Sequence, residues 1–244
     1  MHIEEVVNPE DVKLKIAYHN ELNPKLWDGF DLKPEVRDRL LEISQLFQDF
    51  LKLPELDVVD RVITGSSANY NWTSLSDIDL HLIVNLDSIR PSCSDNILAE
   101  YLQAKKKIWN DLHDITIYGY EVELYAQDAA EQHIATGVFS IEKNEWLLKP
   151  EHIEPAIDDV SIKSKSAELM NWIDEIPTGQ CSSLPEIERI KEKIRRMRRS
   201  GLQEAGEFSV ENLVFKTLRN NGYLEKLSDL QNSITDTCLS IDNK

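Results

Sequence analysis

Hydrophobic side chains recur every three or four residues between residues 34 and 51, and this spacing predicts an amphipathic helix over 34–51. Residues 57–63 are rich in β-branched side chains and predict a short strand. A polar loop over residues 66–76 follows it. Strict alternation of polar and apolar side chains then predicts a second strand over residues 77–84.

The pattern continues with a second predicted helix over residues 97–112 and two strand segments, 115–118 and 121–125. After Pro150 the character of the chain changes. A charged connector without clear periodicity covers residues 154–165. Helical patterns follow it around residues 169–173, 187–197, 208–218 and 224–230.

This order of elements predicts an α+β fold in two parts. Residues 1–150 are expected to form a domain with a small mixed β-sheet, flanking helices and an N-terminal extension. Residues 151–244 are expected to form a mostly helical C-terminal domain.

Composition narrows the class of protein. The chain has 244 residues, of which 41% are hydrophobic and 29% are charged, which is typical of a globular domain. Neither a dinucleotide-binding glycine motif nor a P-loop motif occurs, and no apolar stretch is long enough to span a membrane. The formal charge of −17 argues against a membrane surface or double-stranded DNA as a partner, so any polyanion must meet a local basic patch or bound cations.

The three cysteines are Cys93, Cys181 and Cys238, an odd number without close spacing. This usage predicts free thiols in a reducing compartment rather than disulfides or a zinc site. The acidic N-terminus does not resemble a secretory signal, so a cytoplasmic location is expected.

The candidate chemistry lies around the second predicted strand. Asp77 and Asp79 are two residues apart, so strand alternation points both carboxylates to one face, where they favour a hard cation such as Mg²⁺. Gly65 and Ser66, at the end of the preceding strand, can form a cradle for an anion. Alone, each pair also fits an ordinary turn or a solvated strand face, but their conjunction predicts a metal-assisted nucleotide triphosphate site.

Three aromatic or imidazole side chains near this motif have two interpretations each. Tyr70 and Trp72 could stack on a nucleotide base, or they could pack the loop onto the domain. His81 continues the carboxylate face and could either touch substrate or serve as a structural side chain.

The strand, Gly-Ser, spacer and Asp-apolar-Asp pattern resembles the nucleotidyltransferase superfamily, the DNA-polymerase-β-like group. Further segments resemble nucleotidyltransferases carried largely by tailed bacteriophages, which implies a host cytoplasm as the location. These segments, which extend the resemblance to most of residues 16–230, are ELNPKLWD from Glu21, GYEVELY from Gly119, GVFS from Gly137 and FSVENLVF from Phe208.

The resemblance implies a role for each residue of the motif. Asp77 and Asp79 would bind two Mg²⁺ ions, with Mn²⁺ as the alternative ion, and Gly65 and Ser66 would hold the terminal phosphates. The third carboxylate would come from Glu121 or Glu123, and Glu123 is favoured because Val122 and Leu124 bracket it in the superfamily's apolar-acid-apolar pattern.

A basic run over residues 189–199 stands out in this acidic protein. Seven lysine and arginine side chains are offset there by Glu192 alone. The run could neutralise a triphosphate, grip an RNA acceptor, or form ion pairs with the acidic first domain.

The sequence therefore predicts an enzyme that transfers a nucleoside monophosphate from a nucleoside triphosphate such as ATP to a hydroxyl by a two-metal mechanism. The acceptor is left open between a small molecule, a protein side chain and an RNA end. The alternative is a module on the same scaffold that binds nucleotide or a partner without turnover, as an inhibitor, an antitoxin-like component or a virion accessory protein.

Overall fold

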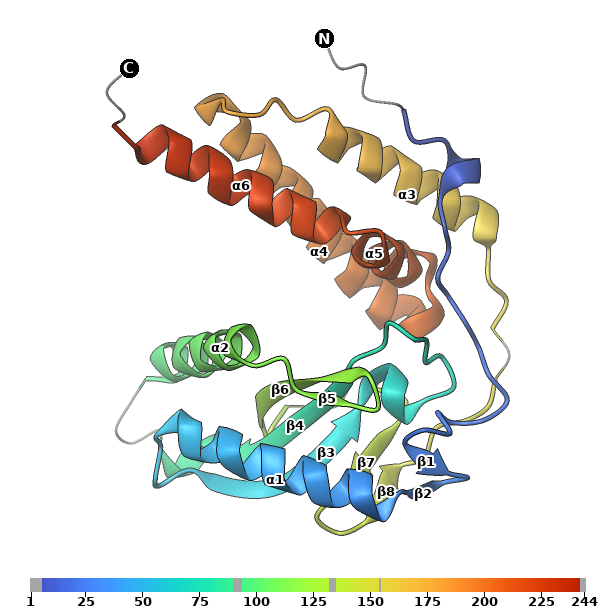
Figure 1. The fold of residues 1–244 in the computed structure, drawn as a ribbon, viewed down its shortest axis with the longest axis vertical. Helices are drawn as coiled ribbons and strands as arrows, with labels where there is room; N and C mark the ends of the chain where they lie inside the picture. The colour runs from blue at the N-terminus through green and yellow to red at the C-terminus, as the bar shows by residue number, and fades with distance from the viewer. Residues whose placement is uncertain (1–5, 90–93, 132–134, 154, 242–244) are drawn as a thin grey trace. The chain divides into compact units, whose positions relative to one another are not determined.

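The first predicted helix buries the side chains that its spacing selects. In the computed structural model, which describes residues 6–89, 94–131, 135–153 and 155–241, helix α1 (Pro34–Leu51) buries Val36, Leu40 and Phe47 along one side. That side, together with α2 (Asp95–Leu112), joins the hydrophobic core of a six-stranded sheet (Figure 1).

The sheet is mixed, with the order β5-β6-β4-β3-β7-β8. Its central pair β4 and β6 is parallel, and the other neighbouring strands are antiparallel. A separate hairpin joins β1 (Trp27–Asp28) to β2 (Asp31–Leu32). The strands of the large sheet are β3 (Asp57–Thr64), β4 (Ile78–Asn85), β5 (Thr116–Ile117), β6 (Tyr120–Asp128), β7 (Val138–Ser140) and β8 (Glu145–Leu148).

The side chains of β4 alternate between the two faces of the sheet, as the sequence pattern predicts. Ile78, Leu80 and Leu82 are fully buried in the core that α1 and α2 share. Asp79 and His81 point to the opposite face and are half-buried. The polar residues of the motif therefore lie on the sheet face that these two helices do not cover.

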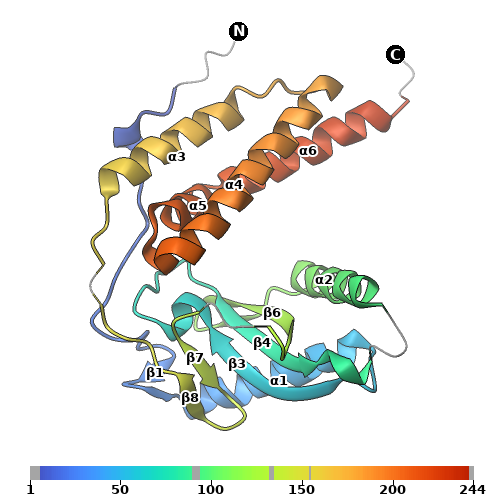
Figure 2. The ribbon, with the colours of Figure 1, turned by 180° about the vertical axis from the view of Figure 1, so that it is seen from behind.

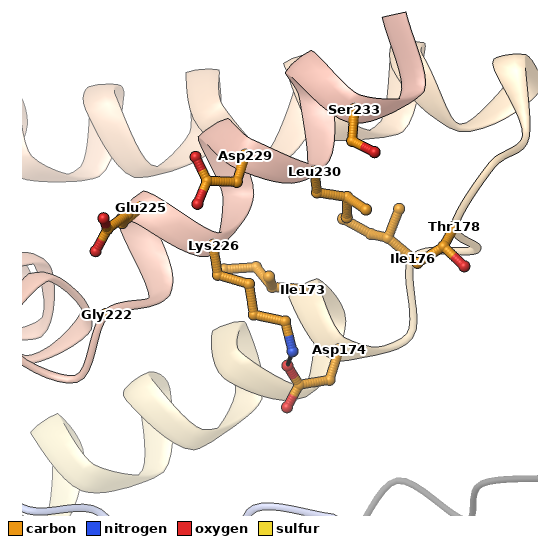
Figure 3. Close-up of a pocket in the computed structure, with 10 residues that line it drawn as sticks. All are labelled: Ile173, Asp174, Ile176, Thr178, Gly222, Glu225, Lys226, Asp229, Leu230 and Ser233. Atoms are coloured by element: carbon orange, nitrogen blue, oxygen red, sulfur yellow. Dashed lines mark hydrogen bonds and ion pairs between the residues drawn. The ribbon is translucent and has the colours of Figure 1, made fainter. Parts of the chain in front are cut away.

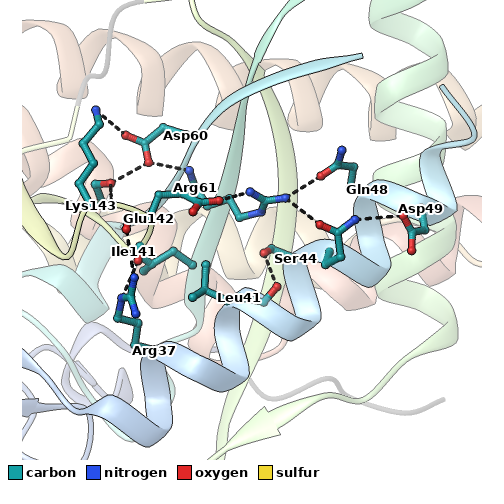
Figure 4. Close-up of polar contacts among 12 residues, drawn as sticks. Arg37, Leu41, Ser44, Gln48, Asp49, Asp60, Arg61, Ile141, Glu142 and Lys143 are labelled. Carbon is teal, nitrogen blue, oxygen red and sulfur yellow. Dashed lines mark hydrogen bonds and ion pairs between the residues drawn. The ribbon is translucent and has the colours of Figure 1, made fainter. Parts of the chain in front are cut away.

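A polar network joins the outer part of the sheet to α1 (Figure 4). Asp60, at an irregularity in β3, is buried and accepts hydrogen bonds from the Ser140 hydroxyl at 2.7 Å and the Arg61 backbone N–H at 2.8 Å, while the Lys143 ammonium lies 3.1 Å from its second oxygen. Arg61 also donates to Gln48 of α1 at 2.6 Å. These contacts give the buried carboxylate the partners it requires.

A second unit contains the C-terminal helices (Figure 2). Its core is formed by apolar stripes that the periodicity predicts, such as Ile187, Ile190 and Ile194. The helices are α3 (Asp159–Asp174), α4 (Leu184–Ala205), α5 (Val210–Asn220) and α6 (Tyr223–Leu239), with short 3₁₀ turns η5 (Cys181–Ser183) and η6 (Gly206–Phe208) between them. An α+β fold with a helical C-terminal region is therefore confirmed.

Residues 6–16 group with the helical unit, although the sequence pattern placed residues 1–150 together. The segment contains the 3₁₀ turn η1 (Pro9–Asp11). The Asn171 side chain accepts a hydrogen bond from the Val7 N–H at 2.8 Å and donates one to its carbonyl at 3.0 Å, so it pairs with this segment as a strand would. The sheet unit covers residues 17–154.

Two sequence-based expectations for the helical unit are wrong. Helix α3 begins at Asp159, inside the predicted connector, because the Asp158 side chain caps it by accepting from the Ser161 N–H at 3.0 Å. Cys181 and Cys238 form a disulfide instead of remaining free, since η5 and the end of α6 are in contact across a separation of 57 residues. Cys93 lies outside the described residues.

The helices of the described residues include none that is both long enough and apolar enough to cross a lipid bilayer.

Candidate functional site

Asp79 occupies the centre of the predicted site. It is the second residue of β4, where it pairs in register with Thr64 at the end of β3 and with Glu123 on β6. Because β4 and β6 are parallel, the paired positions present their side chains to the same face. The sheet therefore brings together two carboxylates that are 44 positions apart in the chain.

Gly65 lies directly against the Asp79 carboxylate. Its backbone has a positive φ of 71°, and a Cβ built there would stand 1.9 Å from Oδ2 of Asp79. Any side chain there would have to displace the Asp79 carboxylate, and the positive φ is also unfavourable for other residues, so two independent reasons favour glycine. The close approach leaves the backbone of the turn η2 (Gly65–Ala68) beside the carboxylate.

Hydrogen bonds hold the loop that carries Ser66 against the start of β4. The Ser66 hydroxyl donates to the Ser76 hydroxyl at 2.9 Å, and Ser76 in turn accepts from the Thr73 N–H at 2.9 Å. The Ser67 hydroxyl donates to the carbonyl of Asp77 at 2.5 Å. Asp77, which directly precedes β4, is thereby fixed to the same turn as the predicted anion cradle.

The two candidates for the third carboxylate have different surroundings. Glu123 is half-buried and in register with Asp79, whereas Glu121 is exposed and pairs with Thr116 on β5. Side-chain alternation alone left both on one face. The register therefore supports Glu123.

The donor set suits Mg²⁺ or Mn²⁺, because Asp77, Asp79 and Glu123 offer only carboxylate oxygens. Within the part of the chain that the structure describes, no group of three or more acidic, histidine or cysteine side chains is arranged to hold a metal ion. Mg²⁺ commonly uses one or two protein carboxylates, with water and substrate phosphates in its other positions, so the paired Asp79 and Glu123 fit this mode.

Of the two aromatic residues that could either stack on a base or pack the loop onto the domain, Tyr70 has the packing role. Its ring is only 6% exposed and lies edge-on to His152, with 4.8 Å between the ring centroids. Trp72 stacks on His19 at 3.8 Å, and its indole N–H donates to the Glu21 carbonyl at 3.0 Å. One face of Trp72 is therefore already covered by the protein.

The sheet face continues past the carboxylates with His81. Its Nδ1 atom is 2.8 Å from the side-chain oxygen of Gln127, and its ring meets Tyr125 edge-on at 5.1 Å. Burial, and secondly the charge of Glu131, raise the pKa of Tyr125 above its ordinary value. Gln127 and Tyr125 were not among the predicted site residues, because only the strand register places them beside His81.

The basic run falls on α4, and several of its side chains contact residues of the helical unit. Arg189 pairs with Glu186 at 3.1 Å, and Arg196 lies 3.7 Å from Glu192. Lys191 contacts Gln231 of α6, and burial lowers its pKa. These contacts leave open the three roles that the sequence suggested.

A cavity of about 500 Å³ lies between the end of α3 and α6 (Figure 3). The Lys226 ammonium lies 2.6 Å from an oxygen of Asp174 at its side, and Glu225 and Asp229 add two more carboxylates. The residues that line it include none of the predicted site residues.

Comparisons with protein-family models, with curated proteins and with solved structures found no match.

Proposed function

We propose that the sheet unit transfers a nucleoside monophosphate from a nucleoside triphosphate to a hydroxyl group. One observation carries the proposal: the ends of three adjacent strands place Gly65, Asp79 and Glu123 next to one another. Carboxylates on neighbouring strands beside a side-chain-free turn suit a substrate that is itself a polyanion with bound cations.

The residues that would hold Mg²⁺, or Mn²⁺ in its place, are Asp77, Asp79 and Glu123. The ion, when bound, offsets the negative charge of the phosphates and of the reacting oxygens.

The turn after β3 contributes to phosphate binding. Because Gly65 has no side chain, its backbone lies directly against the Asp79 carboxylate, so phosphates that share a Mg²⁺ ion with Asp79 would lie near this turn. The hydroxyl of Ser66, which donates to Ser76 at 2.9 Å in this structure, would donate to a phosphate oxygen instead when the triphosphate is bound. This arrangement holds the terminal phosphates while the acceptor oxygen attacks the α-phosphorus and pyrophosphate leaves.

Glu123 is the residue we assign to the proton of the acceptor hydroxyl. It lies beside Asp79 on the parallel strand and is half-buried. The acceptor itself belongs to one of three classes: a small molecule, a protein side chain or an RNA end.

The test is release of labelled pyrophosphate from each of the four nucleoside triphosphates in the presence of Mg²⁺ and a screen of acceptors. Asp79→Asn and Asp77→Asn should each lower the rate by at least about 100-fold, because losing an outer-shell partner of a metal site already costs 10-fold to 100-fold. Circular dichroism should show an unchanged fold.

Asp31→Asn is the matched control. Asp31 is an exposed aspartate of β2 in the same unit, so the same chemical change there should leave the rate unaltered. Normal activity in Asp79→Asn would contradict the assignment. Tight triphosphate binding with no release under any acceptor would instead support the module that binds nucleotide without turnover.

A further inference from the structure

A groove of about 710 Å³ lies beside the first half of α4, where it faces the end of α3. We call it the α3–α4 groove. Arg189, Lys193 and Arg196 line it, with Trp172 of α3. The three cations are four and three positions apart, so they form one stripe along α4. The volume is in the range of sites that hold a small organic ligand.

The exposed ring of Trp172 lies next to the positive charge of Lys193. Its side chain is 36% exposed although tryptophan is usually well buried. The ammonium of Lys193 lies 3.8 Å from the centroid of its ring. The ring and the cation therefore lie together at the edge of the groove, where Lys193 covers one face of the ring and a base would stack on the other face.

The arginines of the groove are held only weakly. Arg189 and Arg196 pair with glutamates of their own helix, Glu186 and Glu192, and their side chains are 76% and 72% exposed. Exposed pairs between helix neighbours stabilise a protein by only about 0.3 to 0.5 kcal/mol. Both guanidinium groups can therefore exchange a carboxylate for a phosphate at little cost.

The negative charge of the protein is concentrated in the sheet unit, so the helical unit that contains the groove repels an anion less. Residues 17–154 contain 25 acidic and 12 basic residues, a net charge of −13. The remaining residues contain 19 acidic and 15 basic ones, a net charge of only −4. Glu175 and Glu186 also line the groove, so its net charge is +1 and a long, unspecific polyanion track is not expected.

We propose that the α3–α4 groove binds a single-stranded nucleic acid, with a base stacked on Trp172 and the flanking phosphates on Arg189, Lys193 and Arg196. Binding sites for single strands combine basic side chains with aromatic rings in this way. A duplex keeps its bases stacked inside and cannot use the ring. An acidic peptide would use the cations but gains nothing from Trp172. The inference does not depend on the proposed transfer reaction.

The test is fluorescence anisotropy of the full-length protein with a fluorescein-labelled 12-nucleotide oligouridylate at several salt concentrations. Trp172→Leu should weaken binding about tenfold. The double variant Arg189→Gln/Arg196→Gln should weaken binding and reduce the slope of log K against log salt by about 1.4, since each phosphate contact on a single strand contributes about 0.7.

Lys13→Gln/Lys107→Gln is the control, because it also removes two positive charges, from exposed lysines that do not line the groove. It should bind like the wild type. Equal losses in the control and in the arginine variant would overturn the proposal, as would no binding by the wild type. Binding of a labelled hexaglutamate peptide or of free UMP as tight as that of the oligonucleotide would also overturn it.

Discussion

The carboxylate of Asp79 occupies the space in which any side chain at residue 65 would begin. A Cβ on Gly65 would lie 1.9 Å from Oδ2 of Asp79 and 2.9 Å from its Cγ. Glycine at this position therefore does more than permit a turn, because it sets how closely the backbone approaches the central carboxylate of the candidate site.

Gly65→Ala should abolish pyrophosphate release, because the new methyl group must displace the Asp79 carboxylate. An alanine held at the positive φ of 71° should also lower the free energy of unfolding of the sheet unit by about 1 to 3 kcal/mol. Gly29→Ala is the control, since Gly29 has a similar φ of 58° but nothing within 4 Å of the added atom. Urea unfolding should show a similar loss of stability in both variants, whereas the release assay should separate them. Equal activities would refute the close-approach argument.

Glu123→Gln should reduce turnover at least about 100-fold and leave triphosphate affinity less affected, since Glu123 is assigned to the acceptor proton. Glu121→Gln should retain normal turnover, because Glu121 is exposed and pairs with β5. The two variants differ from the wild type by the same atoms on the same strand. A loss in Glu121→Gln alone would exchange the two assignments.

The Cys181–Cys238 disulfide closes a loop of 57 residues in the helical unit. Loop-closure entropy predicts that Cys238→Ser lowers the free energy of unfolding of this unit by about 4 kcal/mol. The wild type treated with a thiol reductant should match the variant in urea unfolding. Unchanged unfolding of the wild type after reduction, checked by thiol titration, would show that the crosslink does not constrain the unfolded chain.

The ion pair between Glu211 and Lys165 should make the helical unit sensitive to acid. The hydrogen bond from the Lys165 ammonium at 2.8 Å is the main cause that lowers the pKa of Glu211 below its ordinary value. Because the folded state binds the proton less tightly, the stabilisation is present above pH 5 and is lost as the pH falls through the lowered pKa.

Urea unfolding of wild type and Glu211→Gln between pH 3 and pH 7 measures this contribution. The two proteins should differ at pH 7 and converge at the acid end. A difference that stays constant across this range would mean that the charge of Glu211 does not contribute.

Local patterns were sufficient to predict much of the fold. The spacing of Val36, Leu40 and Phe47 predicted α1, and alternation around Asp79 predicted β4, because helix and strand periodicity arise from the backbone geometry of the segment itself. The same alternation placed Asp77 and Asp79 on one face. No information about distant residues was needed for either result.

Only the tertiary structure decided which distant residues meet. Glu123 rather than Glu121 lies beside Asp79 because of the β4–β6 register, and Tyr70 is buried against His152 rather than open to a base. Three other features have no periodic signal in the local sequence. They are the three-residue strand β7, the hydrogen bond between Val7 and Asn171 and the disulfide between Cys181 and Cys238. Such contacts depend on how whole elements pack, and that packing is determined by the complete chain rather than by any one segment.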